Sequence, residues 1–166
     1  MHHRIASFLL GCWILGSLFM MFVATENFKI ADAAQDAHTR QLFRVMAGQA
    51  NQTFFVTWEI AQIAISIALT GLFFFGVKRR LLASLAGGLF LLAVVQHFWV
   101  TPEMISLTSQ FDTPTSAARF ATLHALYGIT EVLKLLIASV IAGLLIPAWR
   151  THPRSNAAFE PIHYSR

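Results

Sequence analysis

Apolar residues dominate four long stretches of the chain, and short polar segments separate them. The apolar stretches cover residues 5–25, 54–77, 81–100 and 123–149. Each holds about the 20 apolar residues that a helix needs to cross roughly 30 Å of hydrocarbon. The pattern therefore predicts an all-α, integral membrane four-helix transmembrane bundle, which forms a single domain over residues 1–150. We expect residues 151–166, with Pro153 and Pro161, to form a flexible tail.

The first connection, residues 26–53, mixes apolar and charged side chains. Between residues 33 and 50 it contains no proline and a single glycine, Gly48. We expect a helix here, lying at the membrane interface between spans one and two or continuing into the second span.

The other two connections differ in length. Residues 78–80 are so few that spans two and three must form an antiparallel hairpin. Residues 101–122 contain Pro102 and Pro114, and predict a loop with at most a short helix. Pro114 is expected in the first turn of the last helix, with Asp112 or Thr113 as its N-cap.

Composition supports a membrane location. The 166 residues are 56% hydrophobic and only 12% charged, whereas soluble domains contain about 25% charged residues. The apolar run of residues 5–24 is longer than the core of a secretory signal, so we expect a retained first helix. Cys12 is the single cysteine, which excludes an internal disulfide and a multi-cysteine metal site.

Basic residues are distributed unevenly about the predicted membrane. One side carries seven Lys and Arg residues, namely Arg4, Lys78, Arg79, Arg80, Arg150, Arg154 and Arg166. The other carries four, namely Lys29, Arg40, Arg44 and Arg119. The positive-inside rule then predicts that both termini are cytoplasmic. The basic charge is explained by topology, so no nucleic-acid partner is expected. Trp58 and Trp99 are expected at the outer interface and Trp149 at the inner one.

Polar side chains recur at helical spacing within the second and fourth spans. Those of span two are Gln52, Glu59, Gln62, Ser66 and Thr70. The expected face of span four comprises His124, Gly128, Glu131, Ala138 and Ala142, flanked by Tyr127 and Lys134. A charge at the bilayer centre costs about 3 kcal/mol or more, so these faces should meet inside the bundle. With His97 in span three, they define five candidate site residues: Glu59, His97, His124, Glu131 and Lys134.

Two hypotheses for these residues need no cofactor. In the structural one, Glu131 pairs with Lys134 one turn away, and hydrogen bonds between helices fix their register. In the other, a wet cavity in the outer leaflet, lined by Glu59, Glu131 and Lys134, moves protons or a small solute. The indole of Trp13 is expected to reach Glu59 or Glu131.

Two further hypotheses involve a bound group. His97 and His124 lie at similar depth on antiparallel spans, and would be the axial ligands of a b-type haem in a redox or electron-transfer protein. Alternatively, Glu59, His97, His124 and Glu131 would bind a divalent metal such as zinc. No pair of these ligands has the spacing of a metal site on one helical turn, so we expect no metal site.

Three segments carry a family resemblance. They are the first span with Gly11, Trp13 and Gly16, the outer sequence VTPEM at residues 100–104, and RFATLHALYGITEVLKL at residues 119–135. The last segment resembles a family pattern that opens the fourth helix, and matches it at Arg119, Phe120 and His124. The chain thus resembles the transmembrane-protein-205-like family over residues 5–149. It departs from the family at Gly128 and Glu131, where a small polar residue and Asn or Gln are common.

The resemblance implies a multi-pass protein of the bacterial inner membrane, with four helices, no established reaction and no known cofactor. We therefore expect a non-enzymatic protein without catalytic residues. It would act as an interaction or small transport module built around the buried polar faces of spans two and four. The alternative is the haem protein that uses His97 and His124. The lipid bilayer is the expected partner, together with a second copy of the chain or another membrane protein.

Overall fold

The computed structural model describes residues 2–108 and 114–150, and for residues 147–150 it describes the backbone alone. Within these residues the chain is helical and contains no strand. The helices are α1 (His2–Asp32), α2 (Ala37–Gly71), α3 (Arg80–Val95), α4 (Thr101–Thr108) and α5 (Pro114–Arg150). A π-helical turn at Leu72–Gly76 extends α2, and another at Gln96–Val100 joins α3 to α4 without a break. The result is four long helical rods.

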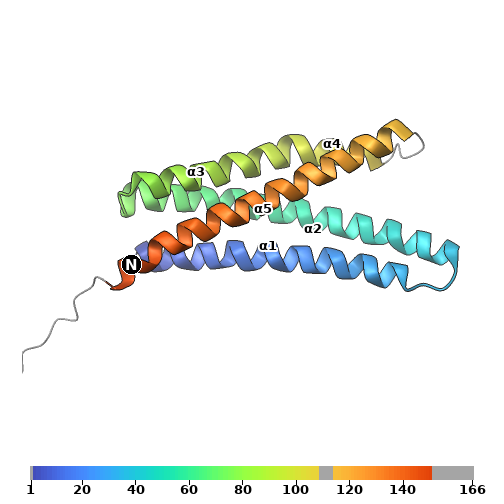
Figure 1. The fold of residues 1–166 in the computed structure, drawn as a ribbon, viewed down its shortest axis with the longest axis horizontal. Helices are drawn as coiled ribbons and strands as arrows, with labels where there is room; N and C mark the ends of the chain where they lie inside the picture. Colours follow the sequence, from blue (N-terminus) through green and yellow to red (C-terminus); the bar gives the residue numbers. More distant parts are fainter. Residues whose placement is uncertain (1, 109–113, 151–166) are drawn as a thin grey trace, which may run out of the picture.

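All four rods are long and apolar enough to cross a membrane, as predicted. They comprise His2–Asp32, Ala37–Gly76, Arg80–Thr108 and Pro114–Ile146. Successive rods run in opposite directions, and α5 packs diagonally against α1 and α3 (Figure 1). The amino-terminal end of α1 lies at the same end of the bundle as the carboxyl-terminal end of α5 (Figure 1).

The first connection is much shorter than its 28 predicted residues, because both flanking helices extend into it. Asp36 is the N-cap of α2, and its carboxylate accepts hydrogen bonds from the backbone N–H groups of His38 and Thr39. From Ala37 the helix runs unbroken into the second span. Of the two arrangements expected for residues 33–50, the structure therefore has the helix that continues into the second span. Residues 37–53 form no separate interfacial helix.

The helical extension of α1 and α2 forms a hairpin that is held by polar contacts. The Asn27 amide donates to Asn51 Oδ1 at 2.6 Å, and Asn51 donates to the carbonyl of Ala24 at 3.2 Å. Near the turn, Arg44 Nε lies 2.5 Å from Asp32 Oδ1. The rod of α2 has 40 residues, or about 60 Å at 1.5 Å per residue. This length is about twice the hydrocarbon thickness, so one end of the hairpin lies beyond it.

The third connection contains the short helix that the prediction allowed, and this helix continues the third rod. Residues 101–108 are helical as α4, and residues 114–122 belong to α5. Pro102 has no N–H, and its ring opposes the carbonyl four residues earlier. The π-helical turn directly before it absorbs this mismatch by widening the helix. Pro114 begins α5 as predicted, whereas the proposed caps Asp112 and Thr113, the tail and the Trp149 side chain lie outside the described residues.

The second connection is the predicted tight hairpin. Lys78 has a φ of 53°, in the left-handed region that non-glycine residues rarely adopt. The N–H of Val77 bonds to the carbonyl of Leu72 at 2.9 Å, and the N–H of Arg79 bonds to that of Phe73 at 3.1 Å. The chain thus reverses within three residues.

Two buried apolar clusters hold the rods together. The larger cluster lies toward the end with the tight hairpin and comprises Ala6, Leu10, Trp13, Leu69, Phe73, Leu82, Ala83, Ala86, Leu89, Ala93, Ala138, Ile141 and Leu145. The smaller cluster lies where α4 meets α5 and comprises Val100, Leu107, Leu123 and Tyr127, with Phe55, Met104 and Phe120 packed against it. In contrast, large apolar side chains such as Phe8, Phe19, Phe75 and Phe98 are more than 60% exposed. This inside-out distribution is that of a multi-pass membrane protein, whose outer surface contacts lipid.

Candidate functional site

Polar side chains occupy the layer between the two apolar clusters. On α5 the buried residues follow the order Leu123, Tyr127, Glu131, Lys134 and Ala138. Glu131 and Lys134 therefore separate the smaller cluster from the larger one. We call this layer the polar seam, and its members are Ser17, Glu59, Gln62, Ser66, Gln96, Thr101, Glu131 and Lys134, all at most 7% exposed.

The Lys134 ammonium is fully buried and has two partners. Its Nζ atom donates to Glu131 Oε1 at 2.7 Å and to Gln62 Oε1 at 2.5 Å. Glu131 also accepts from Gln96 Nε2 at 2.8 Å and from Gln62 Nε2 at 3.4 Å. The predicted pair of Glu131 and Lys134 is confirmed. It lies in a network that joins α2, the π-helical turn after α3, and α5.

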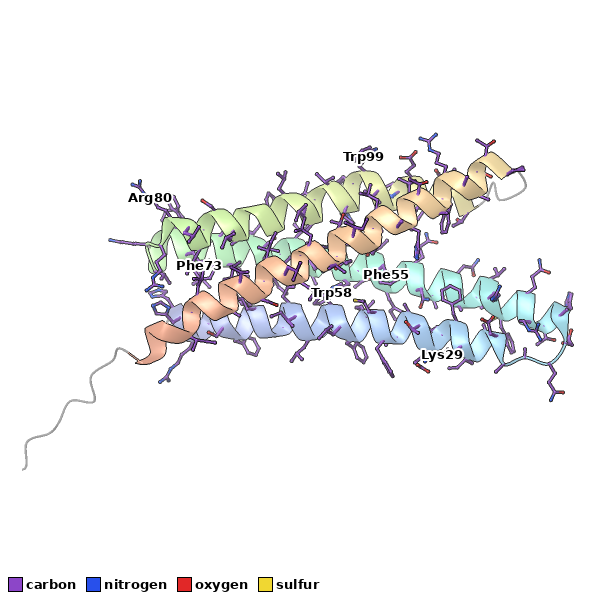
Figure 2. All side chains as sticks on the ribbon, viewed as in Figure 1. Lys29, Phe55, Trp58, Phe73, Arg80 and Trp99 are labelled. Atoms are coloured by element: carbon purple, nitrogen blue, oxygen red, sulfur yellow. The ribbon has the colours of Figure 1, made fainter. Side chains whose placement is uncertain are left out.

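The network reaches α1 through Ser17, whose hydroxyl accepts from Gln62 Nε2 at 3.2 Å and from the indole of Trp58 at 3.3 Å. The Trp58 ring lies between α1 and α2 (Figure 2) and fills the space beside Gly16, where an added Cβ would be 2.1 Å from the ring. The indole N–H of Trp13 is buried without a hydrogen bond. The predicted contact between Trp13 and Glu59 or Glu131 is therefore wrong, and Trp58 is the tryptophan bonded into the network.

A second group is built around Glu59, which is fully buried. Its Oε2 atom lies 2.9 Å from His97 Nδ1, and its Oε1 atom accepts from the Thr101 hydroxyl at 2.6 Å. The His97 side chain is 19% exposed, whereas that of Glu59 is 0% exposed. The imidazole therefore connects a buried carboxylate with the surface of the bundle.

The π-helical turn shapes this part of the site. Gln96, Val100 and Thr101 are all buried, whereas Phe98 and Trp99 are exposed, and Trp99 points outward (Figure 2). A π-helical turn adds one residue to the helix and shifts the facing of those that follow, and such turns are frequent at functional sites. Here the turn brings both Gln96 and Thr101 to the interior, where they bond to Glu131 and Glu59 respectively.

His124 does not join the other four candidate residues. It is exposed on α5 and stacks on the Phe120 ring at 5.9 Å. Glu131 lies at one edge of the interior face of α5, and Lys134 and Tyr127 lie nearer its centre. Because each residue turns the helix by about 100°, His124 and Gly128 on the other side of Glu131 are exposed. The predicted face was thus rotated too far toward His124.

This arrangement bears on both hypotheses that need a bound group. A b-type haem requires two imidazoles that face one slot, but His97 bonds to Glu59 in the interior and His124 is exposed. Among the described residues, no group of three His, Cys, Asp or Glu side chains lies close enough to hold a metal ion. We therefore derive no function from haem or zinc.

The formal charges of the seam do not cancel without His97. Glu59 and Glu131 contribute two carboxylates, and Lys134 contributes one ammonium. Glu131 is compensated by Lys134 at 2.7 Å, whereas Glu59 lies 2.9 Å from His97, which carries a positive charge only if it is protonated. A buried, uncompensated carboxylate is costly, so an ionised Glu59 would be compensated only with His97 protonated.

Two buried polar atoms of the site complete no hydrogen bond, namely the Tyr127 hydroxyl and Gln96 Oε1. An unpaired buried polar group costs about 1–3 kcal/mol. Gln96, Thr101 and Ser17 were not among the predicted site residues. Gln96 is an uncharged polar residue within an apolar run, and that signal could have identified it. The inward facing of Thr101 depends on the π-helical turn, which the sequence pattern does not reveal.

The fold and the seam define the class of this protein, a four-span helical membrane protein with a buried network of ionisable side chains. Searches with family models, among curated proteins and among solved structures found no match to the chain. The resemblance to the transmembrane-protein-205-like family therefore stays a prediction.

Proposed function

We propose that the protein is a non-enzymatic small transport module that binds and releases a proton at the Glu59–His97 pair. The observation that carries this proposal is the contact of 2.9 Å between the buried Glu59 carboxylate and the imidazole of His97. Histidine changes its charge near neutral pH, and intramembrane ionisable residues commonly mark proton or ion pathways. The pair therefore has the chemistry to exchange a proton at the boundary between the seam and the surface.

The two halves of the seam have different roles in this proposal. Lys134 and Glu131 neutralise each other and share the hydrogen bonds of Gln62 and Gln96. They hold the helices in register and provide a polar interior. Glu59 has fewer hydrogen-bond partners than Glu131. Its negative charge is balanced only when His97 is protonated. We assign proton exchange to Glu59 and His97, and the stability of the polar interior to Lys134 and Glu131.

The proposed orientation has both termini in the cytoplasm, which follows from the excess of basic residues at that end. His97 and the hairpin of α1 and α2 would then face the outside. A bacterial inner membrane is proposed on the family resemblance alone. The exposed apolar side chains of the hairpin, among them Phe28, Ile30, Phe43 and Met46, are the surface we propose for a second copy or another membrane protein.

Proton flux into proteoliposomes tests this proposal. Vesicles would contain a pH-sensitive dye, and a valinomycin-driven potassium gradient would supply the driving force. We expect flux with the wild-type protein and none above protein-free vesicles with Glu59→Gln, which keeps the size of the side chain but cannot exchange a proton. Glu103→Gln is the matched control, because Glu103 pairs with Arg119 outside the seam. Equal flux in wild type and Glu59→Gln would disprove the role of Glu59.

A further inference from the structure

Two buried oxygen atoms in the interior could accept hydrogen bonds or bind a ligand, but no protein group bonds to them. Gln96 is 0% exposed and Tyr127 is 8% exposed, yet Gln96 Oε1 and the Tyr127 hydroxyl complete no hydrogen bond. The amide nitrogen of Gln96 bonds to Glu131, so this side chain is fixed and its oxygen faces elsewhere. Buried polar atoms in native proteins are nearly always paired, so two unpaired oxygens at one place indicate a ligand.

Both unpaired oxygens belong to the surroundings of Glu59. Gln96 directly precedes His97, whose imidazole lies 2.9 Å from Glu59. The Tyr127 ring contacts that of Phe55, one helical turn before Glu59 on α2, at a centroid distance of 5.6 Å. The Thr101 hydroxyl donates a hydrogen bond to Glu59 Oε1 at 2.6 Å, which leaves the lone pairs of the hydroxyl oxygen for another partner. A carboxylate, an amide oxygen and two hydroxyl oxygens are thereby gathered from α2, α4, α5 and the π-helical turn.

The chemistry of these donors selects the class of ligand. Oxygen donors bind hard cations, and carboxylate and carbonyl oxygens are typical ligands. The net charge of these side chains then determines the charge of the cation that they can bind. Glu131 is already neutralised by Lys134, so Glu59 offers a single negative charge. One buried charge balances a monovalent cation but not a divalent one.

We propose that Glu59, Gln96, Thr101 and Tyr127 form a binding site for a small monovalent cation such as Na⁺, which competes with the proton of the Glu59–His97 pair. This inference rests on the proposed function in taking Glu59 as the carboxylate that exchanges its proton. A cation at Glu59 supplies the positive charge that protonated His97 otherwise supplies. The seam is neutral with either one bound, but carries an excess charge with both or with neither.

The competition gives the site a defined pH dependence. Besides Glu59 and His97, the ionisable side chains buried in this interior are Tyr127, Glu131 and Lys134, all on α5, whereas among its described residues α1 contributes only the Ser17 hydroxyl to the seam. Since Glu131 and Lys134 neutralise each other, His97 is the group whose protonation opposes the cation. One proton displaces one cation, so the apparent Kd for Na⁺ should rise about tenfold for each unit by which the pH falls, once the pair is mostly protonated.

Thermal unfolding of the purified full chain in detergent tests the site, because a ligand that binds the folded state raises the Tm in a saturable way. NaCl would be titrated against choline chloride at constant ionic strength, at pH 8 and at pH 6. We expect Na⁺ to raise the Tm, choline to leave it unchanged, and the Na⁺ midpoint to lie at higher concentration at pH 6. Equal Tm values in Na⁺ and choline at pH 8 would overturn the site.

The Tyr127→Phe variant distinguishes an effect on Na⁺ binding from an effect on folding. This substitution removes one hydroxyl that has no hydrogen bond, so in choline the variant should be no less stable than wild type. Its Na⁺ midpoint should nevertheless rise at least severalfold, and Glu59→Gln should abolish the Na⁺ response. Thr70→Val is the matched control, because the Thr70 hydroxyl bonds to the Ser66 carbonyl outside the proposed site. An unchanged Na⁺ midpoint in Tyr127→Phe would overturn the site.

The cation site and the proposed function can fail separately. Glu59-dependent proton flux in sodium-free choline buffer, combined with no effect of Na⁺ on the Tm, would overturn the cation site and support proton exchange. A Na⁺ response that needs Glu59 and Tyr127, combined with no Glu59-dependent proton flux, would support the cation site and overturn proton transport.

Discussion

The ammonium of Lys134 and the carboxylate of Glu131 lie 2.7 Å apart, one turn apart on α5, with Lys134 at 0% exposure. The surface offers a pair of the same geometry. Lys29 Nζ is also 2.7 Å from Glu26 Oε1 and also three residues from its partner, but the side chain of Lys29 is 65% exposed. The two pairs thus differ chiefly in burial, and this difference sets what each contributes to stability.

Removing the buried ammonium should destabilise the bundle strongly. Lys134→Met keeps much of the volume but leaves Glu131 as an uncompensated buried charge, and we expect a loss of about 3–5 kcal/mol. Adding Glu131→Gln should recover a large part of this loss. Unfolding in detergent would measure both variants, and Lys29→Met, as the exposed control, should have little effect. Additive losses from Lys134→Met and Glu131→Gln would contradict a coupled pair.

Glycine at position 16 is required by the ring of Trp58. An added Cβ at Gly16 would lie 2.1 Å from the Trp58 ring, whereas nothing lies within 4 Å of the same position at Gly11. Gly16→Ala should displace Trp58, break its bond to Ser17 and cost about 1–3 kcal/mol by overpacking. Gly11→Ala, on the same helix, should be neutral or slightly stabilising. Thermal unfolding of the two variants would decide, and equal Tm values would show that Trp58 does not depend on Gly16.

The amino-terminal turn of α2 should depend on pH through Asp36. Hydrogen bonds from the side chain and the N–H of Thr39, and from the N–H of His38, lower the pKa of Asp36. A lowered pKa in the folded state means that the ionised cap stabilises the helix above the ordinary carboxyl pKa. This stabilisation is lost as the pH falls through the lowered pKa. The protection factors of the His38 and Thr39 amides, which correct for the slower intrinsic exchange in acid, should therefore fall as the pH is lowered.

Two variants at position 36 separate the charge from the hydrogen bond. Asp36→Asn keeps an oxygen that can cap the helix, so it should retain amide protection and lose the acid dependence. Asp36→Ala should lose protection at every pH. If the acid dependence persisted in Asp36→Asn, another group would have to be its source.

The helices were predictable because membrane-spanning length and apolar composition are properties of the sequence alone. The buried part of the α2 stripe, Glu59, Gln62 and Ser66, was also predictable, since 3.6 residues per turn place these positions on one face. The pairing of Glu131 with Lys134 followed from their spacing of three residues. Local periodicity was sufficient wherever a single regular helix positioned the side chains.

Prediction failed where position depended on contacts between helices. The facing of α5 is set by its packing against α1 and α3, which turned Tyr127 inward and His124 outward. The inward facing of Thr101 depends on a π-helical turn beside Pro102. The bond from Trp58 to α1 exists because Gly16 leaves room for the ring. Each of these relationships joins residues distant in sequence or breaks the helical period, so periodicity alone could not reveal it.

The tight turn between α2 and α3 should become more stable with glycine at position 78. Lys78 has a φ of 53°, and a non-glycine residue in this conformation is disfavoured by about 1–2 kcal/mol. Lys78→Gly relieves that strain but increases the freedom of the unfolded chain, so we expect a net gain of up to about 1 kcal/mol. Lys78→Val should be destabilising, because a β-branched side chain tolerates this conformation least.

Position 80 supplies the matched comparison for this turn. Arg80 is the first residue of α3, where the backbone is helical and glycine brings no relief of strain. Arg80→Gly should therefore be neutral or destabilising, while Lys78→Gly stabilises, although each removes one basic side chain from the same connection. Unfolding of the pair in detergent isolates the backbone effect from the charge effect. The same change in stability at both positions would indicate that the charge of this connection, and not the left-handed residue, governs the turn.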